Sequence, residues 1–171
     1  MIDGSIILLP FSILILNEQR DNGKEKGEKM SDTISLLEEV DSGCKMAIDS
    51  MNRIGSYGMD GKLSHVIDHY KYKHMELQKQ ADGMLRQNGA AGKEPGVMAA
   101  AMARMTTGVK MFVKDDNNQV AKIMMDGCNM GIQSIAESIN KYKQASKESV
   151  GLAKSLIKAE EDFMCDLKQF L

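Results

Sequence analysis

Apolar side chains recur at alternating intervals of four and three residues through four long segments of this chain. This spacing constrains the fold more than any other feature, because it places the apolar residues on one stripe of an α-helix that must pack against other helices. The chain also has only 2 Pro and as many as 15 Met, a composition that favours helix over sheet. The repeat is most regular in the first segment, at Thr33, Leu37, Val40, Cys44, Ala47, Met51 and Ile54.

Helices are expected at about residues 31–54, 62–88, 118–143 and 146–171. Ser31 or Asp32 is the predicted cap of the first helix, and Asn88-Gly89 the predicted end of the second. The connection between the second and third helices is far longer than a bundle loop of about two to eight residues, and its residues 96–113 are themselves amphipathic. We therefore predict an all-α, ferritin-like four-helix bundle in up-down-down-up order, with a long, partly helical crossover. A five-helix packing is the alternative.

The first 29 residues differ from the rest and are predicted to be a disordered or wrongly assigned leader, followed by one bundle domain at residues 30–171. The apolar run at residues 6–16 is shorter than the about 20 residues that span a bilayer, and it lacks the flanks of a secretory signal. Residues 17–29 are strongly charged and predicted to be disordered. Residues 26–29 can be encoded by a purine-rich run resembling a bacterial ribosome-binding site, so Met30 is the predicted translation start.

Several strings in the four segments resemble a bacterial ferritin-like family catalogued only as a domain of unknown function. They are Leu36-Leu-Glu-Glu-Val-Asp-Ser-Gly-Cys44, Gly92-Lys-Glu-Pro95-Gly, Met125-Asp-Gly-Cys-Asn-Met-Gly131 and Ala159-Glu-Glu-Asp-Phe-Met164. The resemblance covers residues 30–171. It implies a cytoplasmic helical bundle that often self-associates and has no assigned activity.

The predicted helical stripes lack the ligands of a dinuclear metal centre. Di-iron bundles carry a Glu from each of two helices and a Glu-x-x-His from each of the other two. Here only His74 and Glu160 fall on the stripes as plausible ligands, while the positions that would complete the motif hold Lys71 and Phe163. Ferroxidase chemistry is therefore disfavoured, and no cofactor is expected.

A buried His74 needs a hydrogen-bond partner. The preferred interpretation is a structural histidine bonded to Tyr70, to Glu160 or to backbone. The alternative is a weak metal site made by His74 and Glu160, or a buried pair of the two that titrates near neutrality.

Two further patterns carry weaker signals. His65-Val-Ile-Asp68-His69 resembles the inverted zinc motif H-x-x-E-H with Asp in place of Glu, but it lies on the predicted solvent side of its helix. Met98, Met102 and Met105 form a stripe in the crossover that suits an adaptable protein-binding surface or simple packing against the bundle. Gly127-x-x-x-Gly131 is expected to permit close helix approach.

Charge and composition narrow the function classes. The net charge of −2 and the lack of a basic stripe with aromatics argue against nucleic acid binding. Three widely spaced Cys indicate reduced thiols and a cytoplasmic location. With no nucleophile–base pair or phosphate-binding loop in the sequence, we expect a non-enzymatic bundle that acts by self-association or protein binding. A degenerate iron-handling protein using His74 and Glu160 is the alternative, and membrane association the least favoured.

Overall fold

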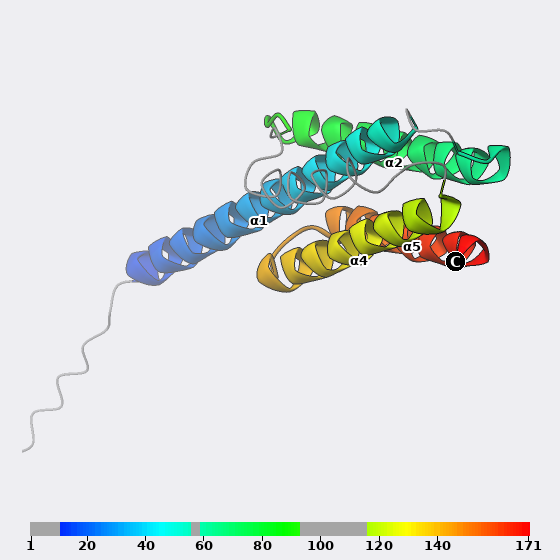
Figure 1. Cartoon of the computed structure of the whole chain (residues 1–171). Helices are drawn as coiled ribbons and strands as arrows, with labels where there is room; N and C mark the ends of the chain where they lie inside the picture. Colours follow the sequence, from blue (N-terminus) through cyan, green and yellow to red (C-terminus); the bar gives the residue numbers. More distant parts are fainter. Residues whose placement is uncertain (1–10, 56–58, 93–115) are drawn as a thin grey trace, which may run out of the picture.

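The structure, a computed structural model, describes residues 11–55, 59–92 and 116–171, with side chains from residue 25 onward. Within these ranges the chain forms four α-helices and a final 3₁₀ turn, packed as a bundle (Figure 1). The all-α four-helix prediction is confirmed for the described part of the chain. The elements are α1 Phe11–Ile54, α2 Gly61–Gln87, α4 Asn117–Lys141, α5 Lys147–Leu167 and η1 Lys168–Phe170.

Hydrogen bonds between helix ends fix the helix directions. At one end of the bundle, the backbone N–H of Asp60, just before α2, donates to Oδ1 of Asn117 at the start of α4 (3.1 Å). At the other end, the turn between α4 and α5 bonds to α1: the N–H of Gln144 donates to Asp32 and that of Ser146 to Thr33, each at 2.9 Å. Hence α1 and α5 run in one direction, and α2 and α4 in the other, as Figure 1 also shows.

The first helix begins further upstream than the sequence predicted. α1 starts at Phe11 and runs without a break through residues 31 and 32, so the expected cap at Ser31 or Asp32 is wrong. Asp32 instead bonds to the α4–α5 turn. The part of the predicted leader from Phe11 onward is helical, and Figure 1 shows it reaching past the end of the bundle. Among the residues whose side chains the structure describes, residues 25–30 are exposed and Thr33 is the first that is buried.

The other helices begin and end at residues with clear local causes. Side-chain oxygens of Asp60, Asp116 and Ser146 accept backbone N–H bonds at the starts of α2, α4 and α5, which satisfies donors that the helix leaves free. After α2, Asn88 is the C-cap and Gly89 has a φ of 71°, which favours glycine. This end was predicted correctly.

The core consists of two clusters of buried apolar side chains. The first cluster packs around Phe163 and Tyr70, whose rings stack with centroids 4.6 Å apart, and contains Met51, Met124 and Cys128. The second cluster contains neither Met nor aromatic rings among its buried members: Leu36, Leu37, Val40, Cys44, Ala81, Leu85, Ile135, Leu152, Ala153 and Leu156.

Most predicted stripes face the core, but that of the last helix is partly wrong. The predicted residue Leu171 is 55% exposed, and Val150, Ile157 and Met164 are only partly buried. The buried face of α5 is turned toward Leu152, Leu156, Ala159 and Phe163 instead. The predicted crossover, including the Met98–Met105 stripe, lies largely in residues 93–115, outside the described residues.

Candidate functional site

A histidine and a glutamate meet at the centre of the bundle. His74 on α2 lies between Tyr70 of the first core cluster and Ala81 of the second, and Glu160 on α5 lies between Phe163 and Leu156 in the same way. The side chains are buried, with His74 at 0% and Glu160 at 6% exposure. The two residues chosen from the sequence as candidate ligands are therefore neighbours.

Both ring nitrogens of His74 are engaged. Nε2 lies 3.1 Å from Oε1 of Glu160, and Nδ1 lies 2.7 Å from the backbone carbonyl oxygen of Tyr70. The prediction that His74 is bonded to Glu160 or Tyr70 is confirmed. Because these bonds come from one neighbouring helix and from the preceding turn of α2, they fix the ring plane as well as its position.

The bonds also restrict where the protons lie. A carbonyl oxygen can only accept, so Nδ1 of His74 carries a proton and donates it to Tyr70. One further proton then lies between Nε2 and Glu160, and the pair is neutral overall in either arrangement. Burial by itself lowers the pKa of His74, but the hydrogen bond and negative charge of Glu160, with the bond to Tyr70, raise that pKa above its ordinary value. The carboxylate of Glu160 thus favours the protonated form of the His74 ring.

A third group, which the sequence did not single out as a partner, completes the centre. The thiol of Cys128 on α4 is hydrogen-bonded to Glu160, and its pKa is raised by burial and by the charge of that carboxylate. The thiol is therefore protonated and donates to Glu160. Gly131, one turn further along α4, makes room for this arrangement, since a Cβ there would lie 3.1 Å from Oε1 of Glu160. Gly131 thus leaves room for the Glu160 side chain; close approach of helices at Gly127-x-x-x-Gly131 stays a prediction.

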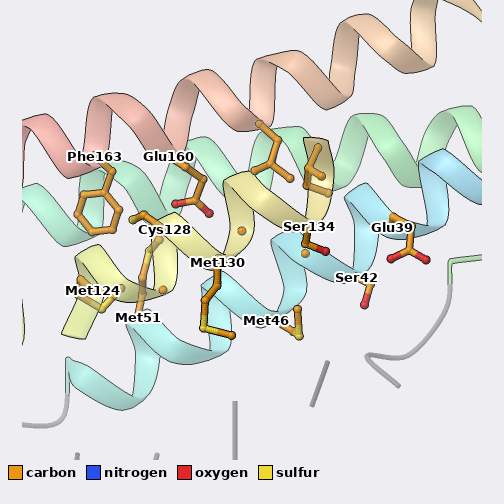
Figure 2. Close-up of a pocket in the computed structure, with 16 residues that line it drawn as sticks. Glu39, Ser42, Met46, Met51, Met124, Cys128, Met130, Ser134, Glu160 and Phe163 are labelled. Atoms are coloured by element: carbon orange, nitrogen blue, oxygen red, sulfur yellow. The ribbon is translucent and has the colours of Figure 1, made fainter. Parts of the chain in front are cut away.

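An apolar pocket of about 60 Å³ opens beside this centre, between α1 and α4. Figure 2 shows Glu160 and Cys128 at its inner end with Met51 and Phe163. Met46 and Met130 lie further along, Met130 being 37% exposed. The pocket connects the buried carboxylate with the surface through a lining that is mostly apolar.

In the part of the chain that the structure describes, the side chains around His74 and Glu160 do not form a dinuclear metal site. No group of three or more His, Cys, Asp or Glu side chains is placed there to hold a metal ion. Lys71, three residues before His74, pairs with Asp68 at 2.7 Å, and Phe163 belongs to the apolar core. A metal held by His74 and Glu160 would have to break the bond between them.

The zinc-like string lies on the solvent side of α2, as predicted. His65, Asp68 and His69 are all exposed, and Asp68 is bonded to Lys71 rather than to either histidine. His69 makes an edge-on ring contact with Tyr70, at 5.0 Å between centroids. These exposed residues therefore remain weak support for a zinc site.

One buried charge was missed by the sequence analysis. Asp41 on α1 is 1% exposed, accepts a bond from Gln78 Nε2 at 2.9 Å, and lies 3.0 Å from Nζ of Lys45. The backbone of Gly92 packs so closely on its carboxylate that a Cβ would not fit. Asp41 follows Leu37 by four residues and precedes Cys44 by three, so its spacing already placed it beside the buried stripe.

None of the helices that the structure describes combines the length and apolar character needed to cross a membrane. Comparisons of the chain with protein-family models, with curated proteins and with solved structures find no match.

Proposed function

We propose that this protein is a ferritin-like helical bundle without a dinuclear centre, which acts by self-association rather than by catalysis. The directions of α1, α2, α4 and α5 are those of the up-down-down-up order, which supports the ferritin-like topology. The bonding of Glu160 to both His74 and Cys128 supports a structural centre. The three cysteines are free, in keeping with a cytoplasmic location.

A shallow groove between α2 and α5 is the observation that carries the proposal. Its volume is about 430 Å³, and Leu77 and Ala159 contribute apolar surface to it. Tyr72, which also lines the groove, is 67% exposed, and Met75 one turn along is 45% exposed. Exposed aromatic side chains beside an apolar groove are typical anchors of protein interfaces.

The charges around the groove indicate a second copy of this chain as the occupant. Lys158 and Asp162 form an ion pair with each other within the chain, and Lys73 and Glu76 add one cation and one anion. An interface related by a two-fold axis brings the same patch together with itself, so a rim of balanced charge can pair cations with anions without net repulsion. The resemblance to a family that often self-associates agrees with this choice.

The experiment is a measurement of molar mass by light scattering over a range of protein concentrations. We expect the wild type to reach two chains per particle, and Tyr72→Glu to remain a single chain, because the buried carboxylate would be unpaired. Leu171→Glu is the matched control, since Leu171 is a comparably exposed apolar residue at the C-terminus. A wild type that stays monomeric, or equal effects of the two variants, would contradict the proposal.

A second candidate function, iron handling by a degenerate site, is favoured by one observation. His74 and Glu160, the two candidate ligands, lie within 3.1 Å of each other. Elemental analysis after expression with iron, manganese and zinc tests this function. Retained metal that is lost in His74→Leu would support it, whereas a metal content that this substitution leaves unchanged would leave a structural role.

A further inference from the structure

Sulphur-bearing side chains concentrate in the pocket between α1 and α4. Four of its 16 lining residues are Met, against 15 Met in the 171 residues of the chain, and Cys128 adds a thiol. The second core cluster contains no buried Met at all, so the enrichment belongs to this pocket and not to the interior in general. The sulphur residues are Met46, Met51, Met124, Cys128 and Met130.

These side chains form an inner and an outer group. Met51, Met124 and Cys128 are at most 5% exposed and belong to the first core cluster. Met46 is partly buried and Met130 is 37% exposed, so these two lie where the pocket meets the surface. Figure 2 shows Met51 and Cys128 at the end of the pocket near Glu160, and Met46 and Met130 further along it. Sulphur-bearing side chains therefore lie both at the inner end of the pocket and where it meets the surface.

The donor set selects a particular kind of ion. Thioethers are neutral and soft and have no proton to lose, and such ligands prefer Cu(I) to the harder divalent ions. Imidazole and carboxylate are the ligands that Fe²⁺ and Zn²⁺ prefer. Of the two carboxylates that line the pocket, Glu160 is bonded to His74, and Glu39 lies far from Met51 and Cys128 in Figure 2.

Size excludes larger ligands. A cavity of about 60 Å³ holds an ion or a few water molecules, whereas sites for cofactors and drug-sized ligands occupy roughly 300–1,000 Å³. Gly43 and Gly131, which also line the pocket, keep this space open, because neither has a side chain to fill it.

We propose that the pocket between α1 and α4 binds one Cu(I) ion through Met51, Met124 and Cys128, with Met46 and Met130 at its entrance. The thioethers bind without a change of charge. Binding of Cu(I) by Cys128 replaces the hydrogen bond between its thiol and Glu160. If Cys128 binds as a thiolate, its proton is released to solvent: one Cu(I) enters, one proton leaves and the net charge of the protein does not change. No electron is transferred.

The test is an anaerobic titration of the full chain with Cu(I) in competition with a chromogenic Cu(I) chelator. It is carried out in a Cys165→Ser background, because Cys165 is an exposed free thiol that would bind Cu(I) outside the pocket. We expect one bound Cu(I) per chain. The double variant Met51→Leu/Met124→Leu, which conserves side-chain volume, is expected to weaken binding on the order of 100-fold.

Met75→Leu is the matched control, because Met75 is an exposed Met of α2 outside the pocket. It is expected to bind Cu(I) as tightly as the background protein. X-ray absorption of the Cu(I) complex should show sulphur neighbours only, a readout that does not depend on the folding of any variant. Failure of the background protein to retain Cu(I), equal weakening by the control, or a shell of only nitrogen and oxygen would overturn the proposal.

Discussion

The two core clusters of the bundle differ in chemistry although the same four helices build them. The buried members of the second cluster are branched aliphatic side chains, Ala and Cys44. The first adds two stacked rings and the thioethers of Met51 and Met124, and it borders the pocket beside Glu160. Aliphatic side chains have few rotamers and specify one packing, whereas Met fills irregular space and adapts. The difference indicates that the second cluster fixes the fold and that the first leaves room for a ligand.

The largest expected effect on stability comes from breaking the buried pair of His74 and Glu160, which lies between the two clusters. Glu160→Leu should lower the free energy of unfolding by about 3–5 kcal/mol, because His74 would lose its counter-charge while remaining buried. Urea denaturation followed by circular dichroism measures this. A loss below about 1 kcal/mol, the range of an exposed pair, would show that Glu160 is not a buried partner.

Replacing one buried side chain of each cluster by Ala compares how much packing in the two clusters contributes to stability. Leu37→Ala in the second cluster and Met51→Ala beside the pocket should both destabilise within the range of about 2–5 kcal/mol. The loss at Leu37 should be the larger, since a side chain that borders a pocket has fewer neighbours to lose. Denaturation of the two variants under identical conditions gives the order. The reverse order would mean that the first cluster is the better packed.

The pH dependence of stability sharpens the role of the central pair. The pKa of His74 is raised in the folded protein, so its contribution is complete below the unfolded pKa of about 6.5 and is lost as pH rises through the folded pKa. The free energy of unfolding should therefore fall as pH is raised above about 6.5. The slope should be smaller in His74→Leu/Glu160→Leu. Parallel slopes in wild type and variant would exclude this pair as the source.

The smallest effects distinguish two glycines of the pocket. At Gly43 a Cβ would make ordinary contacts at 3.6 Å to Leu156 and 3.7 Å to Ile135. Gly43→Ala should then stabilise the helix by about 0.5–1 kcal/mol. At Gly131 the Cβ would press on Glu160, so Gly131→Ala should gain less or destabilise. Gly151→Ala, where nothing lies within 4 Å, is the control, and thermal unfolding gives the ranking.

Much of the fold followed from sequence spacing, and the exceptions have physical causes. The last helix carries two overlapping apolar stripes, and the spacing alone does not choose between Ile157 with Met164 and Leu156 with Phe163. Glu160 belongs to both stripes, which is why its burial was predicted while part of its helix was misassigned. The upstream start of α1 was missed because a capping residue such as Asp32 can also bond to a neighbouring turn, as it does here.

The site was predictable only in part. His74 and Glu160 fall on stripes, so their meeting could be anticipated. The bond from Cys128 and the pocket beside it depend on the register between α4 and α5, which single-helix patterns do not contain. One local signal of this site was Gly131, because the absence of a side chain there leaves room for Glu160.

The central claim is that His74 and Glu160, the buried polar pair of this bundle, satisfy each other's hydrogen bonds and charge. A double-mutant cycle on these two residues tests this claim most directly. The free energy of unfolding is measured for wild type, His74→Leu, Glu160→Leu and the double variant. The account predicts that each single change is strongly destabilising and that the double variant recovers most of the loss, because two apolar groups replace a satisfied pair. A double variant that loses as much as the two single changes added together would contradict it.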